Sequence, residues 1–124
     1  MIIGIGIDVV HISRMSRWRY RPGLLERYFH PQELAAARAR GDSVDHSLAA
    51  RFAAKEAFGK ALGTGLAGLK LVDIEVTNDE NGKPSIRLYR TALVKFERAG
   101  GANLFVSLTH ESDNAIAVVV IEGA

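Results

Sequence analysis

The sequence predicts an α+β fold in which a mainly antiparallel sheet packs on one long central helix, with short helices near the N-terminus. Segments in which apolar residues alternate, as in strands, occur near both ends of the chain. Between them, residues 47–62 are almost wholly apolar or small apart from four charged residues, and they predict a single long helix. The chain has 124 residues, 48% of them hydrophobic, and no repeat or linker divides it, so residues 1–124 form one domain.

The first element is a strand over residues 3–7, where isoleucine alternates with glycine. This strand has one apolar face and one face of bare glycine that ends in Asp8. Glycine at these positions allows another backbone or a ligand to approach closely. Asp8 therefore either lies at the edge of the space beside these glycines or caps the helix that follows.

Short basic helices are predicted over residues 13–20 and 23–40. They are interrupted at Arg21-Pro22-Gly23 and near His30-Pro31, where proline is compatible with a helix start. A turn over residues 41–45 then precedes the central helix.

The central helix is expected to begin at Ser47, as its N-cap, and to end near Leu62 at the segment Gly63-Thr64-Gly65. Residues 73–77 and 85–89 alternate as strands around a turn at 78–84, which predicts a hairpin.

Residues 91–99 are predicted as a helix that stops at two glycines. Strands over 104–109 and 115–121 follow, joined by a loop that contains His110, which continues the face of Leu108 if the strand extends that far. Strand 115–121 is apolar on both faces, so it is either central in the sheet or buried in a subunit interface.

Composition excludes several classes of protein. The absence of cysteine excludes disulfides and thiolate-bound metals, and gives no reason to expect an oxidising compartment, so we expect a cytoplasmic protein. The N-terminus does not resemble a signal peptide, and no apolar run approaches the length of a membrane span. The chain also lacks a P-loop, a Rossmann glycine fingerprint and a nucleophile elbow.

Charge is unevenly distributed along the chain. The formal net charge is +2, but residues 11–40 hold seven arginines against only Glu26 and Glu33. Such a basic segment predicts an acidic partner, which can be a nucleic acid, an anionic membrane surface or an acidic protein. The alternative is a solvated helix surface that uses arginine for its helix propensity.

Glu56 and Lys60 lie one turn apart on the central helix, in an apolar surround. They form either a simple helical ion pair, which contributes about 0.2–0.5 kcal/mol, or part of a functional site. With Asp8 and the glycine-rich segment after the helix, they suit a magnesium–phosphate site. Magnesium takes one or two carboxylates, lysine offers a positive charge to phosphate, and glycine amides can line a phosphate group.

The chain resembles the small bacterial holo-acyl-carrier-protein synthases, which are 4′-phosphopantetheinyl transferases, over nearly its whole length. Five blocks carry the resemblance in order: Gly4-Ile-Gly-Ile-Asp8, Arg51-Phe-Ala-Ala-Lys-Glu-Ala-Phe-Gly-Lys-Ala-Leu-Gly-Thr-Gly65, Asp73-Ile-Glu-Val76, Asn81-Gly-Lys-Pro84 and Val106-Ser-Leu-Thr-His110. The resemblance implies the 4′-phosphopantetheinyl transferase fold. It also implies transfer of the phosphopantetheine arm of coenzyme A to a serine of apo-acyl carrier protein, with release of 3′,5′-ADP, in fatty acid biosynthesis.

By this resemblance, Asp8 and Glu56 would hold Mg²⁺ against the pyrophosphate, and Lys60 would neutralise the leaving phosphate. The serine proton would pass to a carboxylate, with Glu56 the first candidate, or through a metal-bound water. The residues expected around the nucleotide end of coenzyme A are Arg51, Lys60, Gly63, Thr64 and His110.

Acyl carrier proteins present an acidic helix. The resemblance therefore implies that the basic segment is a docking surface for the carrier, with Arg14, Arg17 and Arg21 as candidate contacts. It implies neither a nucleic acid nor a membrane as partner. It further implies a homotrimer with each active site between neighbouring subunits. Two alternatives remain from the sequence: a non-catalytic basic adaptor for an acidic partner, and a Mg-dependent phosphohydrolase that uses the same ligands with water in place of serine.

Overall fold

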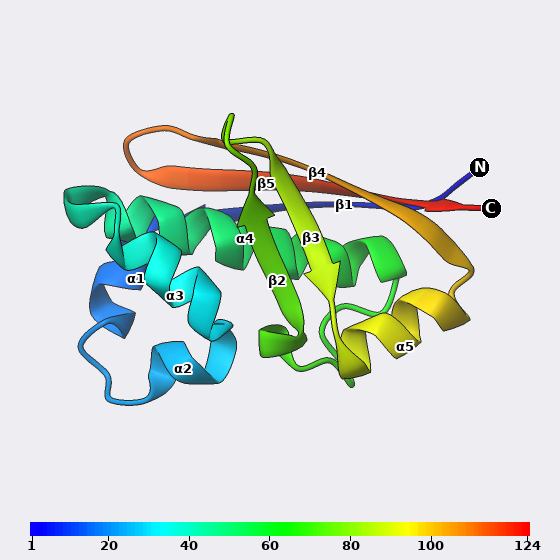
Figure 1. Ribbon diagram of the computed structural model, residues 1–124, viewed down its shortest axis with the longest axis horizontal. Coiled ribbons are helices and arrows are strands. Elements are labelled where there is room, and N and C mark those ends of the chain that lie inside the picture. Colours follow the sequence, from blue (N-terminus) through cyan, green and yellow to red (C-terminus); the bar gives the residue numbers. More distant parts are fainter.

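The computed structural model describes residues 1–124 and shows a three-stranded antiparallel sheet packed on a long helix (Figure 1). The sheet has the order β1-β5-β4, with β1 spanning Ile2–His11, β5 Asn114–Gly123 and β4 Gly101–His110. The long helix is α4, Val44–Leu62. A separate antiparallel hairpin pairs β2, Ile74–Asn78, with β3, Pro84–Leu88. The predicted α+β class is therefore confirmed, with its strands divided between two sheets.

Four shorter helices complete the fold: α1 Ile12–Trp18, α2 Leu24–Tyr28, α3 Pro31–Arg38 and α5 Arg90–Arg98. Short 3₁₀ turns occupy Gly41–Ser43 and Leu71–Asp73. In Figure 1, α1, α2 and α3 gather at one end of the molecule, and the β2–β3 hairpin crosses in front of α4. No helix combines the length and apolarity needed to cross a bilayer.

Helix α4 begins earlier than predicted. Its N-cap is Ser43, not Ser47, and Ser43 makes no side-chain capping hydrogen bond. The preceding 3₁₀ turn already brings Val44 into helical geometry (φ −58°, ψ −42°), so no side-chain cap is needed to start the helix. Ser47 lies inside the helix, where its Oγ accepts a hydrogen bond from Arg51 Nε at 3.2 Å. The predicted end is confirmed, since Gly63 takes a left-handed conformation with φ 84°.

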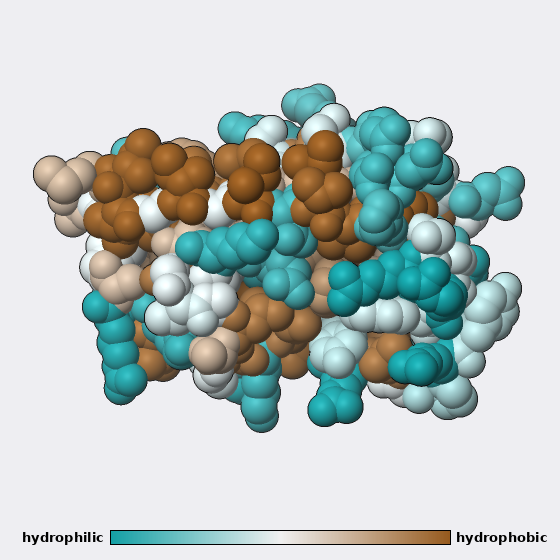
Figure 2. Space-filling model, turned by 180° about the vertical axis from the view of Figure 1, so that it is seen from behind, coloured by the Kyte–Doolittle hydropathy of each residue, from teal (hydrophilic) through white to brown (hydrophobic).

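The glycine face of β1 packs against α4. A Cβ added to Gly4 would overlap the carbonyl oxygen of Ala61, and one added to Gly6 would overlap that of Ala57. The close neighbour that the glycines admit is thus the helix backbone. Two residues farther along, Asp8 lies on this same face and so approaches α4. The isoleucine face of β1 is left exposed on this chain and forms a long apolar row in Figure 2.

Strand β5 is central in the sheet, which confirms one of the two places predicted for it. Its buried side chains, all facing α4, are Ala115, Ala117, Val119 and Ile121. The loop between β4 and β5 is shorter than predicted, because β4 pairs with β5 as far as His110. His110 is therefore the last residue of a strand and not a loop residue, and it continues the face of Leu108.

A buried ion pair that was not predicted joins α3, α4 and β2. Lys55 and Glu33 have fully buried side chains, with Lys55 Nζ 2.6 Å from Glu33 Oε1. Glu33 also accepts hydrogen bonds from the backbone of Val76 and, within the capping box that starts α3, from the backbone of His30. Burial lowers the pKa of Lys55, and the charge of Glu33 opposes this change. Because each charge has several partners, this network fixes the hairpin relative to α4.

Candidate active site

Asp8 and Lys60 meet at the contact between β1 and α4. Lys60 Nζ donates to Asp8 Oδ1 at 3.1 Å and to the backbone carbonyl of Ile7 at 3.0 Å. The simple helical pair between Glu56 and Lys60 is not formed, because Lys60 turns toward the strand. Lys60 therefore joins α4 to β1 and does not pair with Glu56 on the surface of the helix.

Glu56 has neither a hydrogen bond nor an ion-pair partner, although it is half-buried beside Asp8. Burial raises the pKa of the Glu56 carboxyl above its usual range, and the negative charge of Asp8 raises it further. The positive charges of Arg14 and Lys60 act in the opposite direction. Asp8 is bonded to the ammonium of Lys60, whereas the carboxylate of Glu56 is not bonded to any group of the protein.

The donor set suits magnesium. Asp8 and Glu56 supply two carboxylates, and no cluster of three or more histidine, aspartate or glutamate side chains is present that would form an all-protein metal site. Magnesium usually takes only one or two carboxylates and completes its shell with water and substrate phosphates. The residues present therefore fit that ion.

Gly63 and Thr64 lie at the end of α4, about one turn beyond Lys60, and both are exposed. The segment folds back on the helix, with the Gly65 backbone donating to the carbonyl of Gly59 at 3.0 Å. A side chain on Gly59 would collide with the backbone of Gly65, so glycine there permits this close return.

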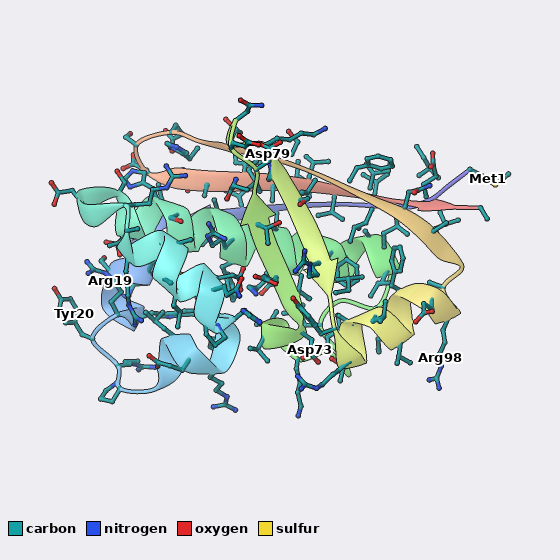
Figure 3. All side chains as sticks on the ribbon, in the orientation of Figure 1. Met1, Arg19, Tyr20, Asp73, Asp79 and Arg98 are labelled. Atoms are coloured by element: carbon teal, nitrogen blue, oxygen red, sulfur yellow. The ribbon has the colours of Figure 1, made fainter.

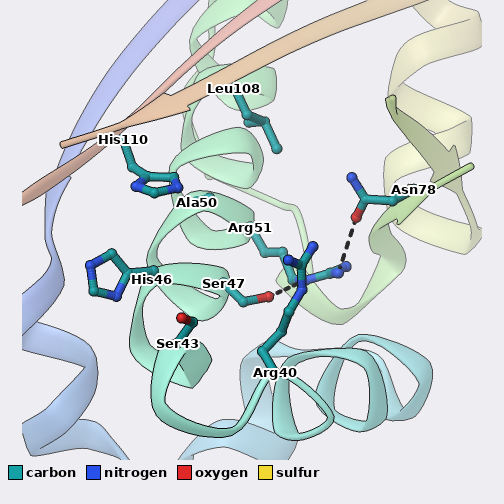
Figure 4. A pocket seen from close by; sticks show the side chains of 9 residues that line it. All are labelled: Arg40, Ser43, His46, Ser47, Ala50, Arg51, Asn78, Leu108 and His110. Carbon is teal, nitrogen blue, oxygen red and sulfur yellow. Dashed lines mark hydrogen bonds between the residues drawn. The ribbon is translucent and has the colours of Figure 1, made fainter. Parts of the chain in front are cut away.

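Arg51 and His110 line a different cavity, of about 300 Å³, at the N-terminal half of α4 (Figure 4). Arg51 is only 5% exposed, and burial lowers the pKa of its guanidinium. Arg51 donates to the Ser47 hydroxyl, the Val76 carbonyl and the Asn78 side chain. Three acceptors thus fix the orientation of its planar group.

The same cavity contains four polar residues that were not selected from the sequence: Arg40, Ser43, His46 and Asn78. The rings of His46 and His110 meet edge to face with centroids 5.4 Å apart, and the buried His46 Nδ1 has no hydrogen-bond partner. His46 was missed because the helix was expected to start after it. With the helix starting at Val44, His46 falls one turn before Ala50 of the same cavity lining.

The predicted site residues form two groups that one chain does not bring together. Glu56 follows Arg51 by five positions, so the two side chains leave α4 roughly 140° apart around its axis. Asp8, Lys60, Gly63 and Thr64 belong with Glu56, whereas His110 belongs with Arg51. Within one chain, the two groups therefore face different sides of α4.

The candidate docking arginines Arg14, Arg17 and Arg21 have no carboxylate partner, whereas Arg19 pairs with Asp45 at 2.6 Å and Arg38 with Glu26 at 3.6 Å. Arg17 and Arg21 are exposed. Arg14 is half-buried, with its guanidinium carbon 4.8 Å from the centroid of the Trp18 ring and 5.0 Å from that of Phe52.

A family model described as the 4′-phosphopantetheinyl transferase superfamily matches residues 4–119. The chain is 54% identical over 123 residues to the holo-[acyl-carrier-protein] synthase of Treponema denticola, covering 99% of this chain and 100% of that protein. The crystal structure of holo-[acyl-carrier-protein] synthase from Neisseria meningitidis is similar with a TM-score of 0.87 and 35% identity, over 98% of this chain and 99% of that one. The crystal structure of a holo-(acyl-carrier-protein) synthase from Bacillus anthracis in complex with CoA (3′,5′-ADP) is similar with a TM-score of 0.82 and 33% identity, over 100% of this chain and 99% of that one.

Proposed function

The chain belongs to the 4′-phosphopantetheinyl transferase superfamily, and we propose from this premise that it transfers the phosphopantetheine arm of coenzyme A to a serine of apo-acyl carrier protein. The products are holo-acyl carrier protein and 3′,5′-ADP. The observation that supports this reaction within the molecule is the meeting of Asp8, Glu56 and Lys60 at the contact between β1 and α4. A non-catalytic adaptor does not fit this family, whose relatives are named as synthases. An adaptor would also leave Asp8, Glu56 and Lys60 without a role.

Asp8 and Glu56 would hold magnesium in this site. The bound ion would stabilise the negative charge that develops on the pyrophosphate oxygens during transfer. The unpaired Glu56 carboxylate, with its pKa raised by burial and by Asp8, supports this assignment because a divalent cation would offset both effects.

Lys60 and Glu56 have separate tasks in the transfer. Lys60 places an ammonium beside Asp8 with its side chain 54% exposed, where it would neutralise the leaving phosphate. Glu56 is the candidate to accept the proton of the attacking serine hydroxyl, because it is a half-buried carboxylate beside Asp8 that has no hydrogen-bond or ion-pair partner within the protein.

The cavity around Arg51 would receive the nucleotide end of coenzyme A. Arg51 uses three of its five N–H donors within the protein, which leaves donors for an anion. Arg40, His46 and His110 add cationic or donor groups around the same space. Guanidinium and imidazole groups are suited to phosphate, so the phosphate on the ribose is the part of the ligand that this cavity fits.

A homotrimer with sites at subunit interfaces explains both the apolar face and the separation of the two groups. Ile5, Ile7 and Val9 on β1 are 61%, 56% and 57% exposed, and Phe105 on β4 is 54% exposed. Such a contiguous apolar face on a soluble chain marks an interaction surface. If neighbouring copies pack through it, the Glu56 group of one copy can face the Arg51 group of the next.

The first test is intact-mass spectrometry of apo-acyl carrier protein incubated with this protein, coenzyme A and Mg²⁺, with an EDTA control. We expect a gain of about 340 Da, the mass of the phosphopantetheine arm, which EDTA abolishes. Hydrolysis of coenzyme A without any gain in carrier mass would favour the phosphohydrolase instead. The proposal extends to a cytoplasmic location and to a role in fatty acid biosynthesis.

A further inference from the structure

Arg14 is held in an unusual way for a residue on a basic surface. Its guanidinium lies over the ring of Trp18 on its own helix and over the ring of Phe52 on α4. Trp18 is in turn fixed by Phe52, edge to face at 5.0 Å, and by Tyr28 of α2 at 5.4 Å. Three helices therefore contribute to the position of one guanidinium.

This mode of contact leaves the hydrogen-bonding edge of Arg14 free. Cation–π contacts use the electron-rich face of a ring, whereas the N–H donors of arginine lie around the rim of its own plane. Arg14 is half-buried but makes no hydrogen bond and no ion pair within the protein, so none of its donors is used there. Two aromatic rings thus restrict the motion of the side chain without consuming its capacity to bind an anion.

The clamp also fixes Arg14 beside the proposed reaction centre. Phe52 and Glu56 are one turn apart on α4 and point to the same side, so a guanidinium over Phe52 lies next to Glu56. In agreement, the positive charge of Arg14 lowers the pKa of Glu56. On the other side, α1 carries the exposed Arg17, so Arg14 stands where the basic surface meets the carboxylates.

We propose that Trp18 is a positioning residue for the carrier protein: with Phe52 it holds Arg14 so that its free edge receives a carboxylate of the carrier next to the serine to be modified. This inference rests on the proposed function, because the partner is the acidic carrier protein named there. Arginine prefers to bind carboxylates through two parallel hydrogen bonds, and a pre-oriented guanidinium loses less freedom when it does so. The excess of arginine over residues 11–40 provides the matching charge.

The test is a double-mutant cycle in the transfer assay with Trp18→Leu, Arg14→Ala and the double variant. We expect Trp18→Leu to raise the carrier KM by about tenfold, the order of effect that a lost cation–π contact gives, with the coenzyme A KM unchanged. If Trp18 acts through Arg14, the double variant is no worse than Arg14→Ala alone. Trp18→Phe keeps an aromatic ring under the guanidinium and should stay within about twofold of wild type.

A matched control is available in the neighbouring pair Arg19 and Tyr20, whose guanidinium and ring are 5.8 Å apart. Tyr20 is 80% exposed and projects from the edge of the molecule, away from α4 (Figure 3). Tyr20→Leu should therefore leave both KM values unchanged. Circular dichroism and thermal unfolding of each variant verify that the fold is kept.

Additive effects of Trp18→Leu and Arg14→Ala, or an equal rise in the coenzyme A KM, would overturn the inference. Equal defects in Trp18→Leu and Trp18→Phe would also overturn it, because volume and not the aromatic face would then matter. If the wild-type protein is active and the variants give such results, only the proposed role of Trp18 is excluded. If the wild-type protein transfers nothing, the proposed function and this inference are both excluded.

Discussion

Glu56 is a residue whose charged form lowers the stability of the fold. Its carboxylate is half-buried beside Asp8 and has no partner of its own. Because its pKa is raised in the folded state, the folded protein binds a proton more readily there than the unfolded chain. Stability from this group therefore falls as pH rises from the ordinary glutamate pKa through the raised one, and the loss persists at neutral pH. Functional carboxylates are commonly held at such a disadvantage.

Glu56→Gln should abolish transfer and keep the fold, because the proposed metal ligand and candidate base is lost while the side-chain volume is kept. Without metal, the variant should be at least as stable as wild type at pH 7, and its advantage should shrink as pH falls below the raised pKa of Glu56. Urea unfolding between pH 4 and pH 8, together with the mass assay, measures both effects. Full transfer activity in this variant would contradict the metal assignment.

His46 provides a second prediction at the residue scale. Its Nδ1 is buried without a partner in the cavity that Arg51 lines, so a phosphate there would gain a hydrogen bond. His46→Ala should raise the coenzyme A KM by about tenfold, the usual loss for a hydrogen bond to a charged group. The carrier KM should not change. His11→Ala, which removes an exposed histidine at the end of β1 outside this cavity, is the matched control.

The contact between β1 and α4 determines the geometry of the site. Gly4 and Gly6 let the strand lie directly on the helix backbone near Ala61 and Ala57. At this separation Lys60 reaches both Asp8 and the carbonyl of Ile7. Gly4 and Gly6 therefore support the geometry of the candidate site as well as the packing of the sheet.

Gly6→Ala should test this contact, because its Cβ would overlap the Ala57 carbonyl and force the strand away from the helix. We expect a loss of about 3 kcal/mol in the free energy of unfolding, the upper range for overpacking. Transfer should fall as well in any protein that still folds. Gly41→Ala is the control: its Cβ meets nothing within 4 Å, and it should cost only about 1 kcal/mol for the left-handed backbone. Equal losses in the two variants would refute the packing argument.

At the scale of the whole molecule, the two groups of site residues lie on different sides of α4. The sheet covers the helix on one side and the hairpin crosses it on the other. The proposed homotrimer would let one site take the two groups from different copies of the chain. The exposed apolar face of β1 and β4 offers the surface for that assembly.

Mixing two inactive variants tests this arrangement. Glu56→Gln lacks one group, and His46→Ala/His110→Ala lacks the other at low coenzyme A. Unfolding and refolding an equal mixture should restore about a quarter of wild-type activity, because that fraction of interfaces combines two intact groups. Each variant refolded alone should stay inactive. No recovery in mixed trimers would place the complete site within one chain.

The sequence by itself predicted the α+β class, the order of the elements and most of their ends. Apolar periodicity and glycine have local effects, so Gly63 at the end of α4 and proline at the start of α3 were both predicted correctly. It also selected Asp8, Glu56 and Lys60, because charges beside apolar and glycine positions are informative without coordinates. The errors at Ser47 and His110 arose where a neighbouring 3₁₀ turn or a paired strand extended an element beyond its own signal.

Only the tertiary structure decided which charges meet. Lys60 bonds to Asp8 and to the backbone carbonyl of Ile7 on β1, and not to Glu56 one turn before it on its own helix. Lys55 is the buried lysine because α3 brings Glu33 over it. The Arg14 clamp and the histidine pair depend on residues distant in the sequence, and on the angle at which each side chain leaves its helix. Such contacts follow from packing of elements, which local sequence patterns do not encode.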